Sequence, residues 1–254
     1  MSMSKPYFQM PIVESGEMLV PISADVFVLE TPHPYEVLGA PYADASPYFL
    51  REGVLIALQA AQAYLQQVQP TWQIMIFDAY RPIAVQAFMV NFTYAQLLDD
   101  KGWQPKTLTV AQTAAAWQEV YELWAPPSLD PKSPPPHSTG GAVDVTLFDT
   151  QTQEPVFMGS EIDELSVRSH PQYFADLANH PQTPPDQKRL AQQADQNRIL
   201  LFESMYKAGF QRHQKEWWHF CRGDQMWAWL TQKQQPHVSV EARYGRIEPI
   251  GENP

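Results

Sequence analysis

Two histidines and one aspartate stand in contexts that could bind a catalytic metal ion. His137 ends the proline-rich stretch PPPH, and Asp144 lies in the alternating run AVDVTLF that follows it. His219 lies in the aromatic run EWWHF near the other end of the chain. Two imidazoles and one carboxylate are a usual ligand set for a catalytic zinc ion, which keeps a fourth position for water. Together these residues predict a hydrolytic metal site.

Each of these residues also has a simpler interpretation. His137 could be an exposed loop histidine, and Asp144 could be a strand-end residue that accepts from the amides of the Gly-Gly pair before it, although aspartate is disfavoured inside strands. EWWHF could be an aromatic core strand with a charge at its edge. That interpretation explains the tryptophans but not the glutamate and histidine that flank them. The remaining histidines lie in polar or proline-flanked segments, where solvated imidazoles are expected: His33, His170, His180, His213 and His237.

Glu216 and Arg81 are the candidate catalytic groups. Residues three apart in a regular strand face opposite sides, so Glu216 and His219 can share a site only if a bulge or turn intervenes, and we predict one there. Glu216 would then be the general base for metal-bound water, whose pKa zinc lowers to about 7. Arg81 could stabilise the negative charge of a tetrahedral intermediate. An ion pair between Arg81 and Asp78 at the end of a strand is an equally open interpretation.

Composition excludes several other classes of function. The net charge of -11 disfavours nucleic acids and anionic membranes as partners, because their phosphates require clusters of Lys and Arg. Cys221 is the only cysteine, which excludes an intramolecular disulfide and a Cys-rich zinc site and suits a reducing compartment. A Cys221 nucleophile with His219 as its base would leave Asp144 unexplained. With no secretion signal or long apolar run in the sequence, we expect a cytoplasmic, soluble protein.

The elements that must position these residues follow from hydrophobic periodicity. In AVDVTLF, Val143, Val145 and Leu147 share the apolar face, so Asp144 is expected on the opposite face, which would line the site. The strand WQIMIFDAY should end at Asp78 and be followed by a helix with Pro82 in its first turn. Other helices are expected at Leu50–Val68, in TVAQTAAAWQEVYELWA and in PPDQKRLAQQADQNRILLFESMYKAGF, where Leu190, Ile199, Leu200 and Met205 would be buried and Gly209 would end the helix.

These elements predict an α+β fold, with a small and mostly antiparallel sheet flanked by helices. We find no internal repeat and no flexible linker, so residues 1–254 are expected to form a single domain. Its motif-bearing core spans about residues 35–220, and VSVEARYGRIEPIGENP is expected to be a polar tail or an edge piece. The sequence does not indicate an oligomeric state.

The motifs taken together resemble a known family. FDAYRP, HSTGGAVDVTL, MGSEID, NRILLFESMYKAGF and EWWHF occur in the order found in the zinc D-alanyl-D-alanine dipeptidases, which include the dipeptidase of vancomycin resistance. The similarity runs from about Tyr35 to Phe220. It implies a zinc D,D-peptidase-like fold and one Zn²⁺ per chain. The implied zinc ligands are His137, Asp144 and His219.

The resemblance also implies roles for the residues around the metal. Glu216 would be the catalytic base, and Arg81 would polarise the scissile carbonyl. Asp163 would bind the free ammonium of a small dipeptide by charge-assisted hydrogen bonding, with Tyr35 sharing this role. Pro135 departs from the family, which usually has serine there.

The expected reaction is zinc-dependent hydrolysis of D-alanyl-D-alanine to two D-alanines. A zinc D,D-carboxypeptidase or endopeptidase acting on peptidoglycan peptides is an alternative. A non-catalytic, zinc-bearing muropeptide-binding protein is another, although such a protein would need neither Glu216 nor Arg81.

Overall fold

A small, mostly antiparallel sheet lies at the centre of the fold, as predicted; the structure is a computed structural model that describes residues 5–247. Its strand order is β2-β4-β5-β8-β7, with β6 paired to β5, and only the β2–β4 pair is parallel. A separate antiparallel pair joins β1 to β3. The strands are β1 (Leu19–Pro21), β2 (Val28–Leu29), β3 (Phe49–Arg51), β4 (Trp72–Asp78), β5 (Ala142–Asp149), β6 (Glu154–Pro155), β7 (Gln211–Arg212) and β8 (His219–Cys221).

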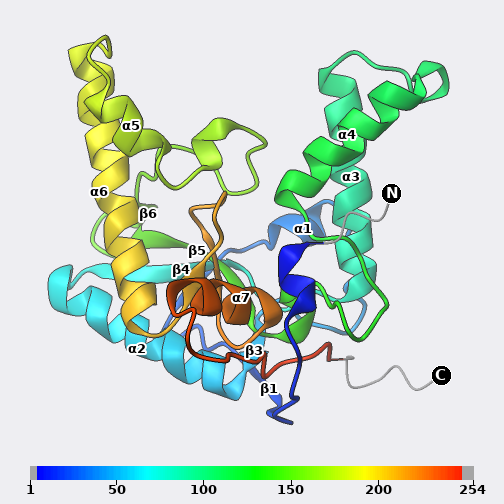
Figure 1. The fold of residues 1–254 in the computed structure, drawn as a ribbon. Coiled ribbons are helices and arrows are strands. Elements are labelled where there is room, and N and C mark those ends of the chain that lie inside the picture. Colours follow the sequence, from blue (N-terminus) through cyan, green and yellow to red (C-terminus); the bar gives the residue numbers. More distant parts are fainter. Residues whose placement is uncertain (1–4, 248–254) are drawn as a thin grey trace.

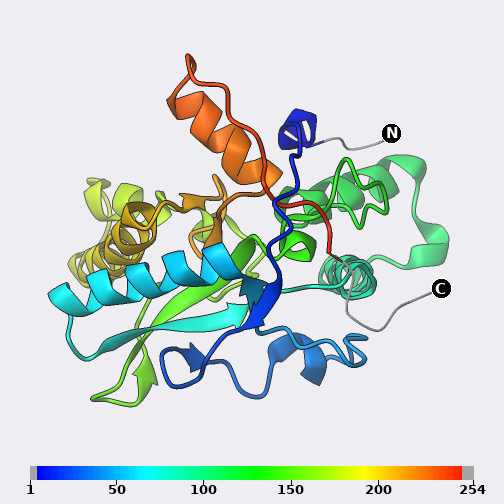
Figure 2. The same cartoon turned by 90° about the horizontal axis from the view of Figure 1, so that it is seen from below.

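Helices flank this sheet on several sides, which confirms the α+β prediction. In Figure 1, α5 and α6 rise on one side of the sheet and α3 and α4 on the other, while α2 runs beneath it. Figure 2, seen from below, shows α2 lying along the sheet. The α-helices are α1 (Pro34–Val37), α2 (Glu52–Val68), α3 (Ile83–Asp100), α4 (Val110–Leu123), α5 (Tyr173–Asn179), α6 (Pro185–Lys207) and α7 (Gln225–Gln234). The 3₁₀ turns are η1 (Pro6–Gln9), η2 (Pro105–Thr107), η3 (Pro136–Thr139) and η4 (Val167–Ser169). None of the helices within residues 5–247 has both the length and the apolar character needed to cross a membrane.

The main hydrophobic core lies between α2 and the sheet. The alternation of β5 is as predicted, since Val143, Val145 and Leu147 are fully buried in this core. Helix α2 contributes apolar residues at helical spacing, among them Leu58 and Leu65. Asp144 consequently lies on the other face of the strand.

Helix α6 buries only part of the apolar set predicted for it: Met205 is fully buried and Leu200 is partly buried against the core. Leu190 and Ile199 are 49% and 47% exposed, so their predicted burial is wrong. The buried face, which packs on α5 and α2, mixes small and large side chains: Ala191, Ala194, Arg198, Leu201, Ser204 and Met205. Gly209 has φ +88° and follows the helix, as predicted for its end.

The C-terminal segment is anchored rather than free. Ala242 forms a parallel bridge with Ile12, and Tyr244 is only 1% exposed in the main core. The Ile247 N–H donates to the carbonyl of Ser138. Up to residue 247 the expectation of a polar tail is therefore wrong and that of an edge piece is closer; the rest of the tail, residues 248–254, lies outside the described residues.

Candidate metal centre and active site

The register of the central sheet brings three polar residues into one row. Directly opposite residues of an antiparallel pair share a face, and Asp144 of β5 is paired with Asp78 of β4 on one side and with His219 of β8 on the other. The β4–β5 register shifts between Ile76 and Asp78. Ile76 opposes a core residue, whereas Asp78 opposes Asp144, because one extra residue moves the side chain to the other face.

His137 reaches this row from η3. Hydrogen bonds join η3 to Arg81, which follows β4. The Arg81 N–H donates to the His137 carbonyl, and the Ser138 hydroxyl donates to the Arg81 carbonyl at 2.7 Å. Gly140, with φ +71°, ends η3 and lets the chain enter β5; a Cβ there would lie 2.5 Å from a methyl of Leu19. The proline and glycine residues around His137 therefore shape a rigid corner and bury the imidazole.

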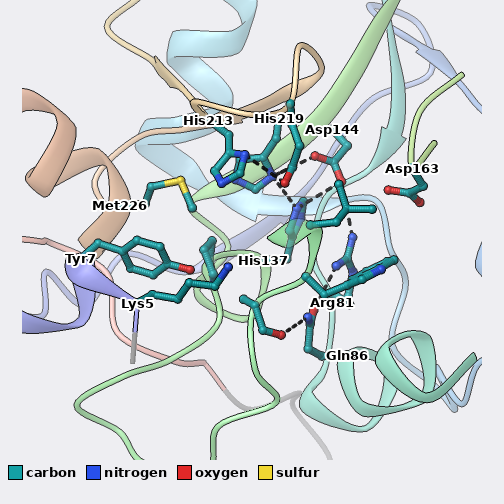
Figure 3. A pocket seen from close by; sticks show the side chains of 15 residues that line it. Lys5, Tyr7, Arg81, Gln86, His137, Asp144, Asp163, His213, His219 and Met226 are labelled. Carbon is teal, nitrogen blue, oxygen red and sulfur yellow. Dashed lines mark hydrogen bonds and ion pairs between the residues drawn. The ribbon is translucent and has the colours of Figure 1, made fainter. Parts of the chain in front are cut away.

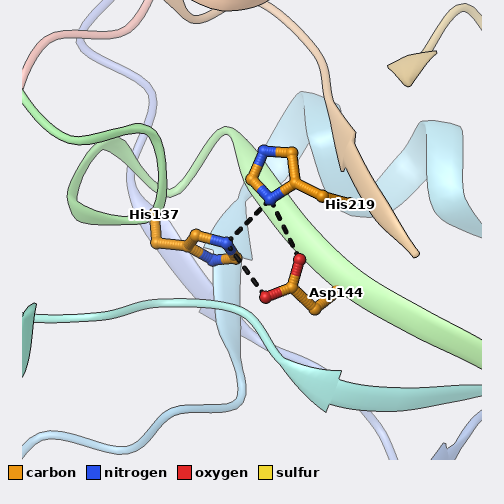
Figure 4. Close-up of side chains that lie close together, drawn as sticks. All are labelled: His137, Asp144 and His219. Carbon is orange, nitrogen blue, oxygen red and sulfur yellow. Dashed lines mark hydrogen bonds and ion pairs between the residues drawn. The ribbon is translucent and has the colours of Figure 1, made fainter. Parts of the chain in front are cut away.

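His137, Asp144 and His219 converge on one point (Figure 4). His137 Nε2 lies 3.2 Å from Asp144 Oδ2 and 3.1 Å from His219 Nδ1, and His219 Nδ1 lies 2.9 Å from Asp144 Oδ1. All three residues are at most 5% exposed. The proximity predicted for these residues is thus present, and neither a loop-exposed His137 nor an Asp144 bonded to glycine amides describes the structure.

The donor set fits a divalent metal ion. His137 Nδ1 lies 2.7 Å from the carbonyl oxygen of Ala79, which can only accept, so the proton lies on Nδ1 and the lone pair of Nε2 faces the cluster. Two ligand atoms bound to one tetrahedral zinc ion lie about 3.3 Å apart, close to the three separations found here. His219 presents Nδ1 to the cluster, and its other ring nitrogen, Nε2, is buried without a hydrogen-bond partner within residues 5–247.

The electrostatics of the cluster also favour a cation. Burial acts to raise the pKa of Asp144, but His137 and His219 outweigh it and hold that pKa well below its usual range. Burial acts to lower the pKa of His137, and the Asp144 carboxylate overcomes this and raises it. The carboxylate is therefore ionised and attracts positive charge, supplied by a proton or by a metal ion.

Glu216 shares the site with His219, as predicted. Trp217 and Trp218 form a bend before β8, and Glu216 Oε2 lies 3.9 Å from His219 Nδ1. The aromatic strand is shorter than expected, because it begins only at His219. Glu216 is 5% exposed, and its Oε1 lies 2.9 Å from Nδ1 of His213. His213, expected to be solvated, therefore belongs to the site.

Arg81 forms the predicted ion pair and also lies beside the candidate metal ligands. Its Nε and Nη2 donate to Asp78 Oδ2 at 3.0 and 2.7 Å, which is the expected ion pair. The same Nη2 lies 3.4 Å from Asp144 Oδ2, so the guanidinium also borders the candidate metal ligands. Nη1 donates to Gln86, and the guanidinium lies over the ring of Trp124, 4.9 Å from its centroid. These contacts leave the cation little freedom.

Asp78 is itself held by residues that the sequence did not indicate. Its Oδ1 lies 3.2 Å from His33 Nε2 and accepts from the Tyr42 hydroxyl at 3.0 Å. Asp78 is fully buried and His33 is 2% exposed, so the expectation of a solvated His33 is wrong. Burial alone would raise the pKa of Asp78, but Arg81, together with His33, lowers it.

Asp163 and Tyr35 lie together beside Arg81. The Tyr35 hydroxyl donates to Asp163 Oδ2 at 2.6 Å, and Arg81 Nη2 donates to the same hydroxyl at 3.2 Å. Burial, aided by the Asp144 carboxylate, raises the pKa of Asp163 to about 7. Asp163 also has φ +64°, a conformation uncommon for residues other than glycine and frequent at functional sites.

One pocket contains most of these side chains (Figure 3). It is lined by Arg81, Gln86, His137, Asp144, Asp163, His213, Glu216 and His219, together with Lys5, Tyr7, Leu123, Trp124, Ala125, Pro136 and Met226. Its free volume is about 30 Å³.

Two other predicted positions contribute no group to the pocket. Cys221 is fully buried; burial and Asp224 raise its pKa well above that of a free thiol, so the structure disfavours a thiolate nucleophile there. Pro135 precedes η3 and has no side-chain donor, while the nearby Ser138 hydroxyl is bonded to Arg81.

Comparisons with known proteins agree with this arrangement. The family model described as D-Ala-D-Ala dipeptidase matches residues 29–241. A D-alanyl-D-alanine dipeptidase of Synechocystis sp. is 46% identical over 96% of this chain and 97% of its own length. Proteins of the same name from Escherichia coli and Enterococcus faecalis are 32% and 27% identical, over 58% and 65% of this chain and 54% and 69% of their own.

Among solved structures, the LD-carboxypeptidase LdcB covers 88% of this chain and 75% of its own. Its identity is 14% and its TM-score is 0.41, a likeness too distant for comparing the sites. The match to the family model, which spans every predicted site residue, and the close full-length relative show that the chain belongs to the D-Ala-D-Ala dipeptidase family of peptidases.

Proposed function

We propose that this protein hydrolyses D-alanyl-D-alanine to two D-alanines with one zinc ion held by His137, Asp144 and His219. The observation that carries this proposal is the convergence of these three ligands with Glu216 and Arg81 in one buried pocket. The close relative from Synechocystis sp. has the name of this activity. A cytoplasmic location is part of the proposal, and the free thiol of Cys221 is compatible with a reducing compartment.

The catalytic role of each residue follows from its contacts. A zinc ion in this site would polarise the scissile carbonyl and increase the acidity of water. Glu216 would accept the proton of the attacking water and pass it to the leaving amine, because its carboxylate lies beside the cluster. Arg81 would stabilise negative charge on the carbonyl oxygen, since its contacts fix the guanidinium before the reaction begins.

Asp163 and Tyr35 would recognise the free ammonium of the substrate. An ammonium donates three hydrogen bonds, and a half-buried carboxylate accepts them more strongly than water-exposed groups do. The Tyr35 hydroxyl fixes the orientation of Asp163. A peptide extended at its amino end would place uncharged chain against this carboxylate, so free dipeptides are favoured.

Release of D-alanine from zinc-loaded protein tests this proposal. The substrates are D-Ala-D-Ala, L-Ala-L-Ala and a pentapeptide that ends in D-Ala-D-Ala, each with and without chelator. We expect chelator-sensitive cleavage of the D,D-dipeptide alone. Glu216→Gln should lower kcat about 10²- to 10⁴-fold, whereas Glu203→Gln, on an exposed position of α6, should leave kcat unchanged.

Other outcomes would replace the proposal. Cleavage of the pentapeptide would identify a carboxypeptidase, and equal rates on L-Ala-L-Ala would contradict stereospecificity. A zinc-loaded protein that binds the dipeptide but cleaves none of the three substrates would be a binding protein.

A further inference from the structure

The N-terminal segment supplies two polar side chains to the pocket that none of the sequence motifs includes. Lys5 and Tyr7 line the pocket together with the metal-binding cluster and Glu216. Both lie outside residues 29–241, the part of the chain that the family model matches. Their presence at the site is therefore a feature that the family match does not explain.

The fold holds this segment in place. Turn η1 lies beside α7 in both views of the molecule, and Gln225 at the start of α7 donates from Nε2 to the carbonyls of Phe8 and Met10. Tyr7 is 4% exposed and packs in a cluster with Met226. Lys5 precedes this anchored turn, so its side chain starts from a fixed point.

Lys5 differs from Arg81, the other cation of the pocket, because it has no carboxylate partner among residues 5–247. The Arg81 guanidinium is paired with Asp78 and also donates to Gln86 and to the Tyr35 hydroxyl. The Lys5 ammonium donates to the backbone carbonyl of Tyr121, and no carboxylate of residues 5–247 forms an ion pair with it. An ammonium has three donors, so two remain available for an anion. Burial lowers the pKa of Lys5, with Glu216 acting against this, and a bound anion would favour the charged form.

The position of Lys5 matches the far end of a dipeptide. In Figure 3, Lys5 and Tyr7 lie on one side of His137 and His219, and Asp163 lies on the other. A dipeptide with its ammonium at Asp163 and its scissile carbonyl at the metal-binding cluster would direct its carboxylate toward Lys5. The pocket thus places the negative Asp163 where the positive ammonium of the substrate would lie, and the positive Lys5 where its negative carboxylate would lie.

We propose that Lys5 binds the free carboxylate of the substrate, with the Tyr7 hydroxyl as a second donor. This inference rests on the proposed dipeptidase function and extends it to the other end of the substrate. Recognition of both ends restricts the enzyme to free dipeptides, because an amide or a further residue at the carboxyl end removes the charge that Lys5 binds. The long, flexible lysine side chain can leave the Tyr121 carbonyl and move with the substrate.

Binding to zinc-loaded Glu216→Gln protein tests the inference without turnover. Calorimetry would compare D-Ala-D-Ala with its C-terminal amide for Lys5→Met, Lys5→Arg and Lys215→Met. The control Lys215 is an exposed lysine, paired with Glu122 and absent from the pocket lining. Lys5→Met should raise the Kd of the dipeptide about 10- to 100-fold and leave the Kd of the amide unchanged. Lys5→Arg should retain most of the affinity, and Lys215→Met should bind both ligands like the parent protein.

Two results would overturn the inference: equal affinities of Lys5→Met and Lys215→Met for the dipeptide, or an equal loss for dipeptide and amide. Thermal unfolding checks that each variant is folded. Tyr7→Phe, which keeps the buried ring, gives a second measurement, and we expect the Kd of the dipeptide to rise about 2- to 10-fold.

Hydrolysis by the wild-type protein is measured separately. If the wild type cleaves D-Ala-D-Ala and Lys5→Met binds it normally, only the role of Lys5 is wrong. If the protein binds the dipeptide through Lys5 without cleaving it, only the proposed reaction is wrong. If D-Ala-D-Ala does not bind at all, both are wrong.

Discussion

Substitution of Asp78 by asparagine should be among the most destabilising isosteric changes in this protein. Asp78 is fully buried and receives two hydrogen bonds from Arg81 and one from Tyr42, with His33 at 3.2 Å. Asparagine keeps the shape but removes the charge and replaces one acceptor oxygen by a donor. Breaking a buried ion pair on one side leaves the other charge uncompensated, at a cost of about 3–5 kcal/mol in the free energy of unfolding.

The exposed ion pair between Lys101 and Glu119 provides the matched control. Its atoms lie 2.9 Å apart, but the side chains are 32% and 42% exposed. Glu119→Gln removes the same charge from a solvated pair and should cost at most about 1 kcal/mol. Urea unfolding of both variants, in the presence of chelator so that metal binding does not contribute, measures the difference.

The pH dependence gives an independent check on the Asp78 argument. The folded-state pKa of Asp78 is lowered, so its stabilising contribution is complete above the unfolded pKa of about 4 and is lost as the pH falls through the folded value. The difference in the free energy of unfolding between wild type and Asp78→Asn should therefore be constant above pH 5 and become smaller at lower pH. Two results would refute the reasoning. One is an Asp78→Asn protein that is no less stable than Glu119→Gln. The other is a double-mutant cycle of Asp78→Asn and Arg81→Gln in which the two losses in the free energy of unfolding simply add.

Three further predictions concern the substrate, the base and the fold. Asp163→Asn should raise KM for D-Ala-D-Ala. In the wild type, KM should fall as the pH rises toward about 7 and Asp163 ionises, and a bound cation would move this transition to lower pH. A variant with the same pH profile of KM as the wild type between pH 5 and 8 would contradict the role of Asp163. In steady-state assays, His213→Ala should lower kcat about tenfold with little change in KM. His213→Asn, which retains a polar group beside Glu216, should keep most of the wild-type kcat. An equal loss of kcat in both variants would exclude a positioning role. Leu201→Ala should lower the free energy of unfolding by about 2–5 kcal/mol, whereas Leu190→Ala, on the exposed face of the same helix, should change it by less than about 0.5 kcal/mol; similar losses in denaturant unfolding would contradict the observed face of α6.

Two features of the candidate metal-binding cluster could be predicted from local sequence alone. The alternation of apolar residues in β5 places Asp144 opposite Val143 and Val145, and the structure confirms this face. The same period of two showed that Glu216 and His219 needed an irregularity between them, and the bend at Trp217 and Trp218 provides it. In both cases a rule about neighbouring residues was sufficient.

Apart from the Arg81–Asp78 ion pair, the network around Arg81 could not be predicted in the same way. Asp78 faces the site because the β4–β5 register shifts, and hydrophobic alternation along β4 alone would place it on the face of Ile76. His33 lies 45 positions before its partner Asp78, and polar neighbours in the sequence do not reveal such a contact. The solvated interpretation of His33 was wrong because burial here is decided by tertiary packing.

The error in α6 has a different physical cause. The helix itself was predicted, but the large apolar side chains were assigned to its buried face. The structure buries Ala191 and Ala194 against Phe174 and Ala178 of α5 instead. Alanine carries a weak hydrophobic signal, yet it permits close approach of two helices. A pattern based on large residues therefore found Met205, missed the alanines and wrongly included Leu190 and Ile199.

The division between predictable and unpredictable residues also follows their chemistry. Metal ligands and a general base require particular side chains in a fixed arrangement, and such requirements leave a motif in the sequence. Recognition of a substrate's charged ends requires only a charge in the right place, which many segments can supply. Lys5 has no motif around it, and it reaches the pocket because Gln225 anchors the segment that follows it. Differences in substrate range among relatives that share the same metal ligands should therefore be sought in such peripheral segments.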